Sequence, residues 1–170
     1  MPVEPRRSGS KPSSSAIIRV GVISDTHGFL NPGLIGVFKA VDRIIHTGDI
    51  ESPEILDALA QIAPLDAVRG NMDFGKWASQ LPREELITIG AISVYALHDL
   101  TRLNLDPEAA GIQVVLSGHT HRPEAHWQGR CLFLNPGSAS LPRNGQAPSV
   151  AILDIRRADI GYRFVALPES

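Results

Sequence analysis

Cysteine is nearly absent from this sequence, with Cys131 the one example among 170 residues. An internal disulfide is therefore excluded, and this fits a reducing compartment, so we expect a cytoplasmic protein. Long apolar runs are also missing, since none approaches the ~20 residues that a membrane-spanning helix requires. Neither charge sign is in excess, because 16 basic and 18 acidic residues give a formal charge of −2. That balance does not favour a protein that coats nucleic acid.

The remaining composition is that of an ordinary globular protein, with 43% apolar and 20% charged residues. A length of 170 residues favours one domain with a substantial core. The first sixteen residues, MPVEPRRSGSKPSSSA, are rich in proline, serine and basic residues and lack the apolar segment of a secretory signal. We predict a flexible tail over residues 1–16 and a single domain over residues 17–170.

The first part of the predicted domain alternates between apolar runs and helix-like stretches. Strands are predicted at 17–23, 43–49 and 65–71, with helices at 31–41 and 52–63 between them. Ser and Pro at the start of the second helix are residues that favour a helix N-terminus. This alternation is typical of parallel strands joined by helices.

The second part is richer in strands. The pattern predicts a hairpin over 85–98, at most a short helix over 106–111, and further strands at 112–121, 130–138, 149–155 and 160–167. Helices around a mixed sheet leave two architectures open, a two-layer sandwich and an α/β/α stack.

Polar clusters follow five of the apolar runs. They are Asp25-Thr26-His27, Gly48-Asp49, Gly70-Asn71-Met72-Asp73, His98-Asp99 and Gly118-His119-Thr120-His121. Ligands of open α/β sheets bind at the carboxyl ends of strands, so we expect these clusters to meet at one edge. Imidazole, carboxylate and amide groups together form the ligand set of Mn, Fe, Zn, Co or Ni. The lack of paired cysteines argues against a structural zinc site.

A purely structural interpretation competes for each cluster taken alone. The sequences DTH, GD and GNMD are common in turns, and His98 alone fits a hydrogen-bonded residue at a strand end. His119 and His121 carry more weight, because side chains two residues apart on an extended segment point the same way. All five clusters together, each after a predicted strand, favour a metal site.

The ordered motifs D-x-H, GD, GN-x-D, H and GH-x-H resemble those of the calcineurin-like metallophosphoesterase superfamily. Their spacing and the chain length resemble its small single-domain phosphodiesterase branch, as does NPGS at 135–138 followed by Pro142-Arg143. The resemblance runs from about Ile17 to the end of the chain. It implies an α/β fold, a four-layer α/β/β/α sandwich of two mixed sheets flanked by helices. It also implies a hydrolase, a binuclear metal-dependent phosphodiesterase.

The resemblance further assigns two divalent transition-metal ions, with Mn²⁺ favoured and Fe, Zn, Ni or Co as alternatives. The residues that would hold one ion are Asp25, His27, Asp49 and His121. Those that would hold the other are Asp49, Asn71, His98 and His119. Asp49 would bridge the ions, and Asp49, Asn71 and His98 would be catalytic. Attack on phosphorus by a hydroxide between the metals would then cleave a small phosphodiester.

Two positions depart from the family pattern. Met72 stands where many members have a histidine, and a thioether cannot protonate a leaving group. Asp99 stands where relatives often have glycine. Its carboxylate would orient a ligand histidine, cap the following segment or repel a dianionic phosphate. We expect substrate contacts from Arg69, Asp73 and Asp99.

Two other functions compete with the phosphodiesterase. A retromer-complex subunit shares this fold and serves as an interaction module, so a catalytically weak protein-binding scaffold is one alternative. The presence of every expected ligand position favours the enzyme. A nuclease is the second alternative, but the sequence has no basic-aromatic surface for a long nucleic acid. The sequence leaves open the natural ester and whether the chain forms a homo-oligomer.

Overall fold

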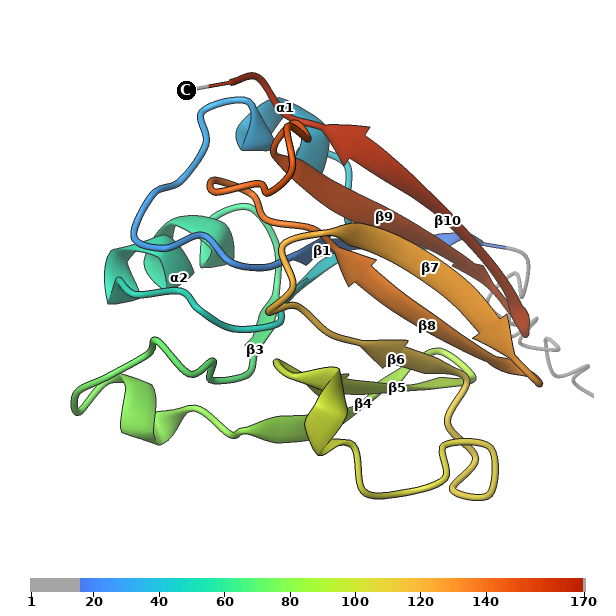
Figure 1. Cartoon of the computed structure of the whole chain (residues 1–170). Coiled ribbons are helices and arrows are strands. Elements are labelled where there is room, and N and C mark those ends of the chain that lie inside the picture. The colour runs from blue at the N-terminus through green and yellow to red at the C-terminus, as the bar shows by residue number, and fades with distance from the viewer. Residues whose placement is uncertain (1–15, 170) are drawn as a thin grey trace, which may run out of the picture.

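The computed structural model describes residues 16–169, which form two five-stranded mixed sheets packed face to face (Figure 1). All of the predicted tail except residue 16 lies outside the described residues. The division into a tail and a single domain stays a prediction. The predicted sandwich of two mixed sheets is confirmed.

The first sheet has a parallel centre and two antiparallel strands at one edge. In spatial order it contains β10 (Asp159–Ala166), β9 (Ser149–Arg156), β1 (Ile18–Ile23), β2 (Arg43–His46) and β3 (Leu65–Ala67). Strands β1, β2 and β3 are mutually parallel, and β9 runs antiparallel to both β1 and β10. The carboxyl ends of β1, β2 and β3 therefore lie at the same edge.

Two α-helices connect the three parallel strands and pack on the outer face of this sheet (Figure 1). They are α1 (Leu34–Phe38) and α2 (Pro53–Ala60). Pro53 opens α2, and Ile55 and Leu59, four residues apart, form its buried stripe. The N-cap residue Ser52 makes no capping bond, since its hydroxyl bonds to the Glu54 side chain. Both predicted helices exist but are shorter than expected.

The second sheet is also mixed. In spatial order it contains β4 (Glu84–Ile89), β5 (Ile92–Leu97), β6 (Val114–Leu116), β8 (Cys131–Pro136) and β7 (Pro123–Gln128). Strands β5, β6 and β8 are parallel, so their carboxyl ends also share one edge. The 3₁₀ helix η1 (Ala78–Gln80) precedes β4, and η2 (Leu100–Arg102) follows β5.

The outer face of the second sheet has no α-helix among residues 16–169. Leu103 and Leu105, in the loop after η2, pack there against Val115 and Phe133. The fourth layer of the expected sandwich is thus reduced to a loop and a 3₁₀ turn. The predicted short helix over 106–111 is a turn.

The main core lies between the sheets, where Val20 and Val22 of β1 join one buried cluster with Val94 and Val114 of the second sheet. Burying each such side chain contributes about 1.5–3 kcal/mol. Gly21 of β1 faces the other way, and a Cβ there would lie 2.9 Å from the Phe38 ring of α1. A glycine is therefore required for α1 to approach the sheet this closely.

Candidate metal centre

The loops that follow β1, β2, β3, β5 and β6 bring the five polar clusters together, although their residues are up to 96 positions apart. Strand β1 ends at Ile23 as predicted, whereas β2, β3, β5 and β6 end earlier than predicted, and the backbone of these loops is not extended. Positive φ angles occur at five of the predicted ligands, namely Asp25, His27, Asp49, His119 and His121. The extended geometry that we expected around His119 and His121 is therefore wrong. Left-handed backbone aims these side chains, at a cost on the order of 1–3 kcal/mol per residue.

One cluster consists of Asp25, His27 and His121, whose ligand atoms all lie within 4.8 Å of one another. The Nε2 atoms of His27 and His121 are 3.1 Å apart, and Asp25 Oδ1 is 3.3 Å from His121 Nε2. Asp25 is fully buried, and its Oδ1 has no hydrogen-bond partner among the described residues. We call this group the inner cluster.

A second cluster surrounds Asp49. Its Oδ2 lies 3.2 Å from His98 Nε2 and 4.0 Å from His27 Nε2, which places Asp49 between the two groups of ligands. His119 Nδ1 is 3.1 Å from Asn71 Oδ1, and the His119 ring meets the His98 ring edge-on. We call Asp49, Asn71, His98 and His119 the outer cluster.

Hydrogen bonds at Nδ1, the ring nitrogen that faces away from the clusters, orient three of the histidine rings. His98 Nδ1–H donates to Thr47 O at 2.8 Å, and His121 Nδ1–H donates to Leu141 O at 2.6 Å. His27 Nδ1–H donates to Glu51 Oε1 at 3.1 Å. In the neutral rings each Nε2 is therefore an unprotonated lone pair that faces the clusters.

The carboxylates are oriented in the same way. Asp25 Oδ2 accepts from Ser24 Oγ at 2.7 Å and from the His119 amide at 3.1 Å, while Asp49 Oδ1 accepts from the Met72 amide at 2.8 Å. The remaining oxygen of each carboxylate is turned toward the histidine lone pairs. Closely spaced lone pairs and anionic oxygens repel one another unless a cation lies among them. The donor set therefore fits divalent metal ions.

The close approach of carboxylates and imidazoles also shifts the pKa values of His98, His121 and Asp49. Burial opposes protonation of His98, but the interaction with Asp49 and the nearby charge of Asp25 outweigh it and raise its pKa. The interaction with Asp25 raises the pKa of His121. Burial opposes ionisation of Asp49, yet His98 and the Met72 amide lower its pKa. Protons and metal ions thus compete for the same nitrogens.

His46 is a supporting residue that the sequence did not single out. It ends β2, is completely buried, and accepts from the Gly48 amide at Nδ1 (3.1 Å). Its Nε2–H points at Thr26 Oγ1, 3.0 Å away, and that hydroxyl donates to Ile50 O. Burial lowers the pKa of His46 to about 3, so the ring is neutral and ties the β1 and β2 loops together. The histidine that directly follows the apolar pair Ile44-Ile45 was the sequence signal that could have identified it.

Glu51, Thr47 and Leu141 were also not anticipated. Glu51 follows the GD motif closely, and an acidic residue at that distance was a usable signal. Thr47 and Leu141 act through backbone carbonyls, which carry no sequence signal.

The expected substrate residues have different environments. Asp73 is buried and accepts from the backbone amides of Ile50, Glu51 and Gly70, so both of its oxygens hold loops rather than face a substrate. Asp99 Oδ1 accepts from the Thr101 amide and hydroxyl, which makes it the cap of η2. Capping was one of the three roles expected for Asp99.

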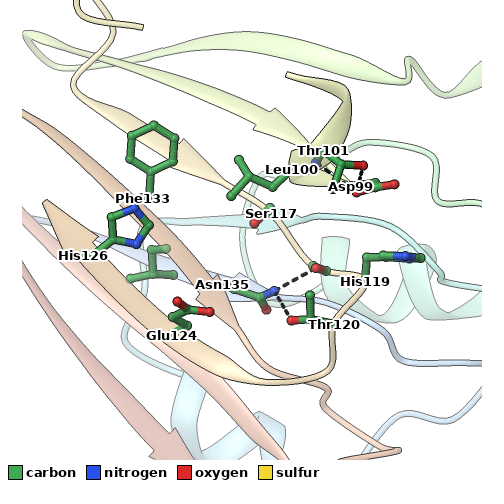
Figure 2. Close-up of a pocket in the computed structure, with 12 residues that line it drawn as sticks. Asp99, Leu100, Thr101, Ser117, His119, Thr120, Glu124, His126, Phe133 and Asn135 are labelled. Atoms are coloured by element: carbon green, nitrogen blue, oxygen red, sulfur yellow. Dashed lines mark hydrogen bonds between the residues drawn. The ribbon is translucent and has the colours of Figure 1, made fainter. Parts of the chain in front are cut away.

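Two cavities border the outer cluster, and Asp99 and His119 line both. The first, of about 440 Å³, has Leu100 and Phe133 in its wall, with the His126 ring stacked on Phe133. Figure 2 shows the His119 ring pointing away from these aromatic side chains. The second, of about 540 Å³, also reaches Asn71, His98 and the third expected substrate residue, Arg69.

Within residues 16–169 the structure has no helix that is both long and apolar enough to cross a membrane.

Curated proteins with similar sequences come from archaea and bacteria. The chain is 39% identical to a probable metallophosphoesterase of Methanocaldococcus jannaschii, over 73% of this chain and 69% of that protein. It is 36% identical to a probable metallophosphoesterase of Methanothermobacter thermautotrophicus, over 80% of this chain and 85% of that protein.

Solved structures share the fold. A predicted phosphoesterase of Streptococcus pneumoniae superposes with a TM-score of 0.69 at 28% identity, covering 89% of this chain and 90% of that one. Vacuolar Protein Sorting 29 of Cryptosporidium parvum superposes with a TM-score of 0.71 at 17% identity, covering 90% and 99%. Residues 18–158 match the family model of the calcineurin-like phosphoesterase superfamily domain. The chain therefore belongs to the calcineurin-like phosphoesterase superfamily, a family of metal-dependent phosphoesterases.

Proposed function

We propose that this protein is a phosphodiesterase that uses two divalent metal ions to hydrolyse a small phosphodiester. The observation that carries the proposal is the convergence of fixed Nε2 lone pairs and carboxylate oxygens around Asp49. The ligands of one ion would be Asp25, His27, His121 and Asp49. The ligands of the other would be Asp49, Asn71, His98 and His119.

The donor set favours Mn²⁺, with Fe, Zn, Ni or Co as alternatives. When bound, two such ions supply a nucleophile from water near neutral pH and neutralise charge on the phosphoryl oxygens. Asn71, His98 and His119 line the second cavity, so they are placed to meet a phosphoryl group that enters there. Asp49 holds the two halves of the site at a fixed separation.

The surroundings favour a diester with a good leaving group. Met72 is 44% exposed beside Asn71, and its thioether cannot donate a proton. General acid catalysis is typically worth about 10²–10⁴-fold, and its loss matters most for poor leaving groups. We expect aryl diesters to react faster than alkyl diesters. We also expect Met72→His to narrow that difference if the new imidazole reaches the leaving oxygen.

A scaffold role is the second candidate, because the fold is shared with a protein named for vacuolar protein sorting. The fold alone does not separate the two functions. Buried carboxylate oxygens and histidine nitrogens that lack partners, such as Asp25 Oδ1 and His98 Nε2, are costly unless a metal ion is bound among them. Their presence at the shared strand edge favours the enzyme.

The test combines metal analysis with kinetics. The purified protein is loaded separately with Mn²⁺, Zn²⁺, Fe²⁺, Co²⁺ and Ni²⁺, and bound metal is counted by mass spectrometry. Hydrolysis of bis-p-nitrophenyl phosphate, p-nitrophenyl phosphate and an alkyl diester is then measured for each form. We expect two ions per chain and the highest kcat/KM for the aryl diester.

Asp49→Asn should lose this activity, and its matched control is Asp159→Asn, which removes the same charge at the start of β10, at the end of the first sheet away from the centre. This variant should behave like the parent protein. A fully loaded protein with no turnover of any ester would contradict the phosphodiesterase proposal and support the scaffold.

A further inference from the structure

Three arginines line the second cavity beside the outer cluster. Arg69 follows β3, Arg83 precedes β4, and Arg102 ends η2, so three separate segments deliver them to one cavity of about 540 Å³. The same cavity is lined by His98 and by other outer-cluster residues. A group attached to a phosphate at the metal centre can therefore reach the arginines through continuous open space.

The three guanidinium groups differ from the structural arginines of this protein. Arg19 and Arg163 both pair with Asp154, and Arg43 pairs with an aspartate on the neighbouring strand β3. No side-chain hydrogen bond or ion pair of Arg69, Arg83 or Arg102 occurs within residues 16–169, although Arg102 acts electrostatically on Asp99. Within the described part of the chain, the N–H groups of these three guanidinium groups therefore remain available to bind a ligand.

The carboxylates of the same cavity offset only part of this charge. The two that line it are Glu84 and Asp99. Glu84 is hydrogen-bonded to the Tyr95 hydroxyl, and Asp99 Oδ1 accepts twice from Thr101. Three cations against two engaged carboxylates leave the cavity positive in a chain whose formal charge is −2.

The first cavity provides an internal comparison. It contains Glu124 and Asp99 but no arginine, and Phe133 and Leu100 supply apolar surface. Positive charge is therefore confined to one side of His119. Guanidinium groups bind phosphate and carboxylate groups through paired, charge-assisted hydrogen bonds.

We propose that the cavity formed by Arg69, Arg83 and Arg102 binds an anionic group on the substrate, so that the preferred phosphodiesters carry a second phosphate or carboxylate beyond the reacting phosphorus. This inference rests on the proposed phosphodiesterase function, and it assigns the class of substrate for the same site. The reacting phosphate lies at the metal centre, and the second anion lies among the arginines.

The kinetic test uses two substrates that differ by one phosphate. They are thymidine 5′-(p-nitrophenyl phosphate) and its 3′-phosphorylated derivative, which share the scissile bond and leaving group. The 3′-phosphate should raise kcat/KM by about tenfold or more at low ionic strength, the effect expected for one charge-assisted hydrogen bond. Salt should reduce this advantage, because the cavity is partly open to solvent.

Arginine variants test whether the preference for the 3′-phosphorylated substrate comes from this cavity. In Arg83→Gln and Arg102→Gln the ratio of the two kcat/KM values should fall toward one. The matched control is Arg130→Gln, in the turn between β7 and β8 and at the end of that hairpin away from the centre, which removes the same charge. It should keep the parent ratio. An unchanged ratio in both arginine variants would overturn the proposed site.

A binding measurement separates this inference from the proposed function. Calorimetry of metal-free protein should show tighter binding of thymidine 3′,5′-bisphosphate than of thymidine 5′-monophosphate, and Arg83→Gln should remove the difference. If no diester is hydrolysed but this pattern holds, the anion site stands and the phosphodiesterase proposal fails. If both diesters are hydrolysed equally and the two nucleotides bind equally, the phosphodiesterase stands and the anion site is wrong.

Discussion

The inner and outer clusters are built from the same residue types but differ in their access to solvent. His27 and His121 are only 11% and 8% exposed at their side chains, and Asp25 is fully buried. In the outer cluster the side chains of His98 and Asp49 are buried as well, at 5% and 4% exposure, but Asn71 and His119 are exposed, and His119 borders both cavities. We therefore expect an ion in the inner cluster to be retained, and we expect ligands to exchange at the exposed side of the outer cluster.

The largest change should come from Asp49→Asn, because Asp49 Oδ2 lies between His98 of the outer cluster and His27 of the inner cluster. Loss of its charge removes the anion that would separate two cations. We expect both ions to be lost and kcat/KM to fall by at least about 10³-fold, the upper range for removing one stabilising group. Metal content and kinetics on an aryl diester check this. Retention of two ions would show that Asp49 does not join the clusters.

The next largest change should separate the clusters. His121→Ala should remove the inner ion and lower thermal stability in Mn²⁺, because it opens a buried site. His119→Ala should leave the inner ion in place and lower kcat by about 10²-fold, because it removes a ligand of the outer ion and with it part of the charge stabilisation. Metal stoichiometry and thermal melting in Mn²⁺ distinguish the two variants. Equal metal loss and equal destabilisation would mean that the clusters are not different.

A smaller change should weaken the inner cluster alone. Glu51 accepts from His27 Nδ1–H, and Glu51→Gln keeps the shape while removing the charge. Loss of such an orienting partner typically lowers metal affinity by about 10–100-fold. Titration with Mn²⁺ should show one weakened site and one unchanged site. The control is Glu54→Gln in the first turn of α2, which should affect neither.

An effect on stability, with no change in metal content, should come from His46, which bonds to residues of the loops after β1 and β2. Its folded pKa of about 3 lies below the unfolded value near 6.5, so the unfolded chain binds more protons between these pH values. The free energy of unfolding should therefore fall by at most about 1.4 kcal/mol per pH unit from this residue as pH drops from about 6.5 toward 3. Urea unfolding of metal-free protein should show a shallower pH dependence in His46→Gln. Identical slopes would rule out this contribution.

Much of the architecture could be predicted from apolar runs. The runs around Val20, Ile45 and Val114 indicated strands, and each lies in the core between the sheets. Strand β7 was missed because its sequence, PEAHWQ, is polar at an exposed sheet edge and shows no apolar run. The helix expected over 106–111 did not form, since one turn with little buried surface cannot offset its nucleation cost.

The sequence predicted which residues form the candidate site, but it did not predict how their backbone and side chains are arranged. The order of the motifs indicated which side chains would meet, because they follow parallel strands. Sequence could not show the left-handed backbone at Asp25 or His121, which depends on tertiary contacts. The sequence also could not show that the Asp73 carboxylate would accept hydrogen bonds from three backbone amides. An aspartate that holds loops and one that faces a substrate look the same in sequence.

The long sequence separation of the clusters has a consequence for folding kinetics. His27 meets His121 across 94 positions, and both residues have strained backbone. Because closing such long loops costs entropy, we expect these contacts to form late in folding, after the two sheets have packed together. Interactions that are absent from the folding transition state mainly slow unfolding. A bound metal ion would then slow unfolding of the native protein without speeding its folding.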